Sequence, residues 1–133
     1  MSRILHLAVA LLYNDAKEIL LVRKDHSTHY MLAGGKIEPD ENYLSALTRE
    51  LDEELNILAP VYLPRFAGQF EAPAAHEKGY TVQAMLFTLY WPYPIQVGAE
   101  ITQAHWFHPD DTANLRLAPL AKRVVGAGLI HIY

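Results

Sequence analysis

The segment at residues 34–57, GGKIEPDENYLSALTRELDEELNI, most constrains what this chain can fold into. Its leucines recur at three- and four-residue steps, the spacing of one apolar stripe on an α-helix. The stripe consists of Leu44, Leu47, Leu51 and Leu55. Asn42 is a suitable N-cap, and Asn56 tolerates the left-handed backbone that ends many helices. The pattern therefore predicts a helix over residues 43–55, followed by Asn56 at positive φ.

The same segment carries carboxylates along one edge of that helix. At about 100° per residue, Glu50, Glu53 and Glu54 fall within about 100° of arc, next to the leucine stripe. Asp52 points nearly opposite. Because like charges at this spacing repel, the edge is either a solvated acidic face or a site with a positive partner. A divalent cation such as Mg²⁺ suits the second alternative, since it prefers carboxylate oxygens.

Strands are expected on both sides of the helix, where apolar runs are bounded by turn residues. The expected strands cover residues 3–13, 18–24, 30–33, 61–70, 80–91 and 104–107. Other expected elements are a short strand or loop at 36–38, an exposed loop at 71–78, a turn or short helical piece at 109–114, and a helix at 117–129. Strands combined with two helices predict an α/β (α+β) fold, a sheet covered by helices, in one domain over residues 1–133.

Composition and charge exclude several classes of function. The chain has no cysteine, which excludes disulfides, thiolate catalysis and cysteine-ligated metal sites. Its net charge is −4 and it has no basic run, which argues against binding a nucleic-acid polymer. The apolar run at 4–13 is too short for a membrane span and lacks the flanks of a signal peptide. We therefore expect a cytoplasmic protein with no nucleic-acid or membrane partner.

The helix segment resembles the Nudix box, whose pattern is G-x5-E-x7-R-E-U-x-E-E-x-G-U, with U an aliphatic residue. In this chain the box spans residues 35–57. The matching positions are Gly35, Glu41, Arg49, Glu50, Leu51, Glu53, Glu54 and Ile57. The remaining position, a glycine in the family, is Asn56, which can adopt the same backbone. The chain thus looks like a small, single-domain, MutT-type member of the Nudix hydrolase family.

This resemblance implies a fold and a reaction. The fold would be an α/β/α sandwich, in which a mixed, curved sheet carries the box helix and a C-terminal helix. The reaction would be Mg²⁺- or Mn²⁺-dependent hydrolysis of the pyrophosphate linkage in a nucleoside diphosphate linked to a group X, with water attacking phosphorus. The alternative is a Nudix-fold sensor that binds nucleotides without turnover and has usually lost box acids. The partner would be a small nucleotide-type molecule, and a homodimer is compatible with the family.

The resemblance also assigns roles within the box. Glu50, Glu53 and Glu54 would be the metal ligands and catalytic carboxylates, with the Gly34 carbonyl as a backbone ligand. Arg49 would orient the box glutamates through charge-assisted hydrogen bonds, and its alternative role is an ordinary helix ion pair. The structural positions of the box are Gly35, Glu41 and Asn56.

Candidates outside the box are fewer. Glu100 precedes Trp106 at the spacing of a loop glutamate in MutT-type members, and is the candidate extra metal ligand or general base. Its alternative is a surface turn acid, and Glu71 and Glu77 are the other loop candidates.

Substrate contacts are expected from cations and aromatics. Arg23, at the end of the second strand, matches a phosphate-binding cation of some family members, although it could be a solvated strand-end charge. Lys36 follows the glycine pair and could also meet phosphate. Strand aromatics could stack on a base, although most such residues belong to the core. They are Phe66, Phe70, Tyr80, Trp91 and Tyr93.

Overall fold

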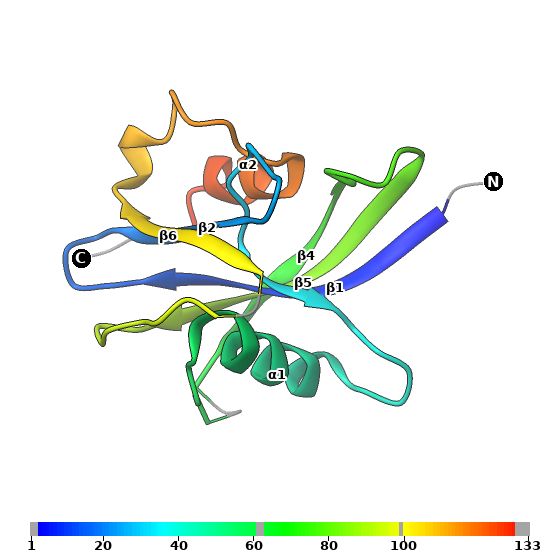
Figure 1. The fold of residues 1–133 in the computed structure, drawn as a ribbon, viewed down its shortest axis with the longest axis horizontal. Helices are drawn as coiled ribbons and strands as arrows, with labels where there is room; N and C mark the ends of the chain where they lie inside the picture. The colour runs from blue at the N-terminus through cyan, green and yellow to red at the C-terminus, as the bar shows by residue number, and fades with distance from the viewer. Residues whose placement is uncertain (1–2, 61–62, 99, 130–133) are drawn as a thin grey trace.

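The computed structural model describes residues 3–60, 63–98 and 100–129 (Figure 1). The strands are β1 (Arg3–Tyr13), β2 (Ile19–Lys24), β3 (Ala33–Lys36), β4 (Arg65–Pro73), β5 (Tyr80–Tyr90) and β6 (Ile101–Phe107). The helices are α1 (Tyr43–Leu55), the short 3₁₀ helix η1 (Pro109–Asp111) and α2 (Pro119–Gly126). The expected combination of strands with two α-helices is confirmed.

The strands form one mixed sheet with β1 near its centre. The order is β4-β5-β1-β2-β6, and β3 also pairs with β1. β1 runs parallel to β5 over its whole length, from Arg3 opposite Tyr80 to Tyr13 opposite Tyr90. The other strand pairs are antiparallel. Helix α1 lies on one side of this sheet and α2 on the other (Figure 1), so the predicted α/β/α sandwich is confirmed.

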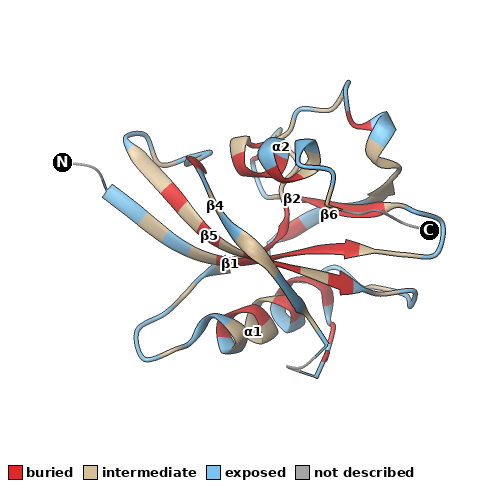
Figure 2. Ribbon diagram, turned by 180° about the vertical axis from the view of Figure 1, so that it is seen from behind, coloured by how far each residue is buried: buried red, intermediate tan, exposed pale blue. Residues whose placement is uncertain are grey.

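Successive residues of β1 serve opposite faces of the sheet, as the pleat of a strand requires. Ala8, Ala10 and Leu12 pack in the core under α1. Val9 and Leu11 pack in the core under α2. The buried residues run along the central strands and the inner sides of both helices (Figure 2). The sheet therefore separates two apolar layers, each closed by one helix.

Helix α1 has the predicted bounds and the predicted caps. The Asn42 side chain accepts a hydrogen bond from the Ser45 amide at 2.8 Å. Asn56 has φ +54°, and its amide donates to the Asp52 carbonyl at 3.0 Å. The Asn56 side chain also donates to the Gln96 carbonyl at 2.6 Å. Asparagine thus replaces the glycine of the pattern in the left-handed conformation and adds a contact that glycine cannot make.

The strand expected at residues 30–33 was misplaced. β3 instead includes both glycines, with Gly34 opposite Val9 and Gly35 opposite Ala8. Gly34 has φ +134°, and a Cβ there would lie 2.2 Å from the Ala8 carbonyl oxygen. We expected the glycine pair to follow this segment as a loop that turns tightly against the helix, but its missing side chains instead allow β3 to approach β1 closely.

Other boundaries also needed correction. β4 is shifted from the expected 61–70, of which residues 61–62 lie outside the described part of the chain, and it extends into the predicted loop as far as Pro73. Proline is tolerated there because β4 is an edge strand, where a missing amide breaks no ladder. β6 begins three residues before the expected start at 104, at Ile101.

Helix α2 is shorter than the predicted 117–129. Ala118, which precedes Pro119, has ψ 153°, because a residue before proline avoids the helical region. The helix ends at Gly126, and Gly128 takes the left-handed conformation. Within the three described ranges, no helix combines the length and the apolarity needed to cross a bilayer.

Candidate active site

Arg49 of α1 connects two of the box acids, Glu41 in the loop before the helix and Glu50 within it. Its Nε and Nη2 donate to the two carboxylate oxygens of Glu41 at 2.9 Å each. Its Nη1 donates to Glu50 Oε2 at 2.8 Å, and Nη2 also donates to the Lys36 carbonyl at 3.0 Å. The bonds from Arg49 lower the pKa of Glu41 to about 2, and the bonds to Glu41 and Glu50 raise the pKa of Arg49. We call this set of guanidinium bonds the Arg49 fork. It fixes Glu50 and the loop before α1 relative to the helix.

Gly35 lies directly against the carboxylate of Glu50. A Cβ at this glycine would be 2.5 Å from the Glu50 Cδ. Any larger residue would have to displace that carboxylate. Gly35 therefore sets the position of Glu50 from the strand side, while Arg49 sets it from the helix side.

Glu54 is almost fully buried, which is rare for a carboxylate. Only 1% of Glu54 is exposed to solvent, and its Oε1 accepts a hydrogen bond from the Gly34 amide at 2.9 Å. Burial raises the pKa of Glu54 to about 7, against the opposing effects of Lys24 and the Gly34 amide. Its Oε2 has no hydrogen-bond partner in the part of the chain that the structure describes.

Lys24 supplies the counter-charge of Glu54. Its Nζ lies 3.2 Å from Glu54 Oε2, close enough for an ion pair but without the angle of a hydrogen bond. The same ammonium lies 3.9 Å from Glu100 Oε1. The Glu100 carbonyl accepts from the Asp25 amide at 2.9 Å, which holds Glu100 beside the end of β2. Lys24 therefore lies between one buried and one exposed carboxylate.

Glu53 is the most exposed of the three predicted helix ligands. Half of its side chain, 52%, is accessible, and Arg49 Nη1 is 3.7 Å from its Oε2. Among the described residues, no three acidic, histidine or cysteine side chains converge as a complete metal site. The donors nevertheless suit a hard divalent cation, because the buried Glu54 Oε2 accepts no hydrogen bond from any described residue and the neighbouring acids also offer carboxylate oxygens.

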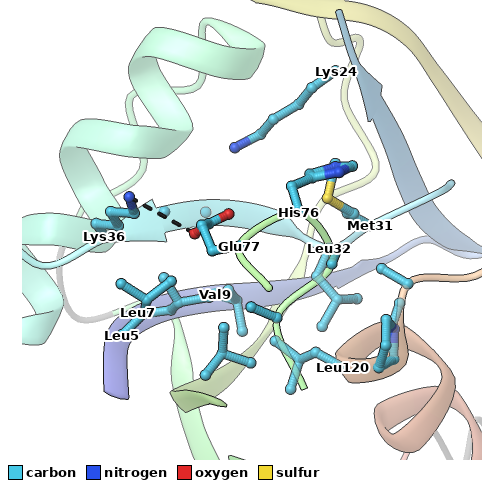
Figure 3. A pocket seen from close by; sticks show the side chains of 18 of the residues that line it. Leu5, Leu7, Val9, Lys24, Met31, Leu32, Lys36, His76, Glu77 and Leu120 are labelled. Atoms are coloured by element: carbon cyan, nitrogen blue, oxygen red, sulfur yellow. Dashed lines mark ion pairs between the residues drawn. The ribbon is translucent and has the colours of Figure 1, made fainter. Parts of the chain in front are cut away.

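A cavity of about 530 Å³ adjoins this acidic edge (Figure 3). Its charged end includes Lys24, Glu50 and Glu100, together with the backbone of the glycine pair. At the mouth, Lys36 Nζ lies 3.9 Å from Glu77 Oε2, an ion pair that joins the end of β3 to the β4–β5 loop. The far end is apolar. The volume of the whole cavity is within the usual range of pockets that bind small molecules.

The sequence of the box and the fold around it agree with one family. The family model of the NUDIX domain matches residues 5–126. The chain belongs to the Nudix family. It is 31% identical over 125 residues to the CTP pyrophosphohydrolase of Escherichia coli (strain K12). This match covers 88% of this chain and 85% of the relative. The family match and this relative together identify the chain as a Nudix pyrophosphohydrolase.

Solved structures share the Nudix fold. The MutT protein from Methanosarcina mazei Go1 has a TM-score of 0.78 at 24% identity, over 96% of this chain and 94% of that protein. The bifunctional NMN adenylyltransferase/ADP ribose pyrophosphatase from Francisella tularensis, complexed with AMP and a Mn ion, has a TM-score of 0.75 at 23% identity. The match covers 97% of this chain and 42% of that one.

The Nudix fold brings most of the predicted site residues together. Around the cavity lie Gly34, Gly35, Lys36, Glu50 and Glu100. Glu54 is connected to them through its bond to Gly34. The described aromatics that we considered for base stacking do not line this cavity.

Arg23, the predicted phosphate-binding cation, is not among the described residues that line this cavity. Its guanidinium donates to the Ser27 carbonyl, at 3.2 Å from Nη2, and lies 5.6 Å from the centre of the Tyr30 ring. The residue that lines the cavity is its neighbour, Lys24. Strand alternation could have distinguished them, because Leu20 and Val22 pack under α1 and the next residue on that face is Lys24.

Proposed function

We propose that this Nudix pyrophosphohydrolase hydrolyses the pyrophosphate linkage of a nucleotide-type substrate in a reaction that depends on Mg²⁺ or Mn²⁺. The proposal rests on one juxtaposition: the braced Glu50 and the cation Lys24 line the charged end of a cavity whose other end is apolar, and Oε2 of the buried Glu54 lies 3.2 Å from Lys24 Nζ. Nudix hydrolases generally use divalent metal ions. The similarity to a CTP pyrophosphohydrolase supports a nucleotide-type substrate.

Glu50, Glu53 and Glu54 would hold the cation, with the Gly34 carbonyl and Glu100 as further ligands. A bound divalent cation offsets the charge that develops on the leaving phosphate and acidifies a water molecule. The protein contributes by keeping the ligands in place. Arg49 orients Glu50 through its bond to Oε2, and the Gly34 amide orients Glu54.

Two lysines are suited to bind the phosphate chain. Lys24 and Lys36 both line the cavity, at its charged end and at its mouth. Arg23 stays a prediction from the sequence, and the geometry favours Lys24. Glu100 is our candidate for the general base, since its exposed carboxylate lies at the charged end beside Lys24 and could accept a proton from the attacking water.

A substrate panel with two glutamate variants tests this function. Wild type is expected to release phosphate or pyrophosphate from nucleotide substrates only with Mg²⁺ or Mn²⁺. Glu53→Gln and Glu54→Gln are each expected to lower kcat/KM by at least about 100-fold, because an amide is a poor metal ligand. The matched control is Asp52→Asn, an exposed acid on the same helix, which should change kcat/KM little.

One outcome would reject the enzyme in favour of the sensor. Wild type would then bind nucleotides by calorimetry, yet turn over no member of the panel with either metal. The prediction of one domain over residues 1–133 also stays a prediction, as do the cytoplasmic location and the homodimer.

A further inference from the structure

The far end of the cavity is built from aliphatic side chains. β1 contributes Leu5, Leu7 and Val9 from alternate positions. Leu32, Val82 and Leu120 complete this wall. Figure 3 shows these leucines and Val9 grouped below the loop that carries His76 and Glu77. We call these six residues the apolar wall.

Most polar side chains of the cavity belong to its charged end or to its mouth. Lys24, Glu50 and Glu100 belong to the charged end near α1. Lys36 and Glu77 face each other across the mouth. Two further polar residues line the cavity: Glu38, whose Oε1 lies 3.9 Å from Arg49 Nη1, and His76, on the exposed β4–β5 loop. An organic group placed against the apolar wall therefore meets few side-chain donors or acceptors.

This distribution limits how the organic group can be recognised. A site that hydrogen-bonds a polar edge rejects an analogue without that edge by a factor of about 10⁴ to 10⁵, because buried partners are then left unpaired. An apolar pocket discriminates by size and shape, typically by only about 10- to 200-fold. The apolar wall belongs to the second kind of site.

We propose that this site selects its substrate by the phosphate chain and by the size of an apolar or aromatic organic group, without reading the hydrogen-bonding edge of a base. The inference rests on the proposed function and deepens it. Substrates of the class would include nucleotides with different bases, and the same phosphate chain attached to an apolar aromatic group. The charged end holds the phosphates, and the apolar wall accepts one face of the ring.

The first test removes the edge of the base while keeping its shape. We compare kcat/KM for dTTP and for the triphosphate whose base is 2,4-difluorotoluene, an apolar isostere of thymine. The two values are expected to agree within about 10-fold, as should the values for CTP and UTP. A preference of more than about 100-fold for dTTP, or for one of the two pyrimidine nucleotides, would overturn the inference and leave the proposed function intact.

A second test asks whether His76 reads a base. His76→Ala should change kcat/KM for every substrate, including the isostere, by the same factor. Leu120→Ala should also lower all values by a common factor, because it removes apolar contact from the wall. A base-selective loss of more than about 10-fold in His76→Ala would overturn the inference.

A binding measurement separates this inference from the proposed function. The α,β-methylene analogues of the same nucleotides, which resist hydrolysis between those phosphates, are titrated by calorimetry with Mg²⁺. Similar affinities for all bases together with no turnover of any nucleotide would reject the proposed function and retain the inference about recognition. Affinities that differ by more than about 100-fold among the bases would overturn the inference.

Discussion

The Lys24 ammonium lies 3.2 Å from Oε2 of Glu54, a carboxylate that is 1% exposed. An ionised carboxylate at such depth needs a counter-charge. Lys24 provides it within the protein itself. The charged end of the cavity is therefore partly neutralised by an internal cation.

Replacement of Lys24 by methionine should destabilise the metal-free protein. Removing one partner of a buried pair costs about 3–5 kcal/mol, and we expect about 1–3 kcal/mol because Lys24 is partly exposed. The measurement is the free energy of unfolding in urea above neutral pH, where Glu54 is ionised. Millimolar Mg²⁺ should reduce the deficit. Lys122→Met, on the exposed side of α2, is the control, and equal stability of the two variants would contradict the prediction.

The two glycines of β3 should respond differently to alanine. In Gly34→Ala the new Cβ would lie 2.2 Å from the Ala8 backbone oxygen at positive φ, so we expect a loss of stability above about 3 kcal/mol. In Gly35→Ala it would meet the Glu50 side chain, which can move. That variant should fold but lose about 100-fold in kcat/KM, because small displacements of catalytic groups are costly. Gly126→Ala is the control, since among the described residues no atom outside the neighbouring helix backbone lies within 4 Å of the new Cβ. Full activity of Gly35→Ala would refute the prediction.

Replacement of Arg49 by lysine should impair the enzyme, although the positive charge is kept. The guanidinium makes two parallel bonds to Glu41 and another to Glu50, a geometry that an ammonium cannot reproduce. We expect Arg49→Lys to lower kcat/KM by about 10- to 100-fold, the usual effect of losing the partner of a metal ligand. Steady-state kinetics at saturating Mg²⁺ measures it. Arg65→Lys, on the exposed edge of β4, should behave as wild type. An equally active Arg49→Lys would show that the fork is dispensable.

Stability of the metal-free protein should fall as pH rises toward and through neutrality. Burial raises the pKa of Glu54 from 4.5 to about 7, so the folded state binds this proton more tightly than the unfolded state. The resulting stabilisation is fully present below pH 4.5 and is lost as pH rises through about 7. Glu41, with its lowered pKa, acts in the opposite direction and in a lower window, from 4.5 down to about 2.

Urea unfolding across this range tests the contribution of Glu54. Glu54→Gln should abolish the decline, whereas Glu71→Gln, an exposed acid, should retain it. Because a metal needs the ionised carboxylate, Mn²⁺ affinity by calorimetry should rise by up to about tenfold per pH unit below 7 and then level off. An unchanged decline in Glu54→Gln would assign it to another group.

The sequence was sufficient for the elements that local interactions determine. Helix α1 has its predicted bounds because its leucine period, its Asn42 cap and its Asn56 terminus all lie within the segment. β1 was also found with its bounds, since a long apolar run needs no knowledge of its partners. β3 was misplaced because its glycines become a strand only through β1.

The cavity required information that lies far apart in the chain. Its apolar wall joins residues from Leu5 to Leu120, which no local pattern connects. The box pattern identified Glu50, Glu53 and Glu54 as site candidates. The burial of Glu54, however, depends on its contacts with β3 and β2, which the pattern does not contain. Lys24 was missed because the side of β2 that meets α1 was not considered.

The alternation along β1 has a consequence for how such a protein can diverge. Ala8 and Ala10 pack under the helix that carries Glu50, Glu53 and Glu54, while Leu5, Leu7 and Val9, between and before them, belong to the apolar wall. Because the two sets point to opposite faces of the sheet, mutations can change the shape of the apolar wall without disturbing the packing of β1 against α1. A single-residue insertion near the start of the strand would exchange the two sets and disrupt both. New specificities are therefore accessible by substitution in this strand, whereas length changes within it should be eliminated by selection.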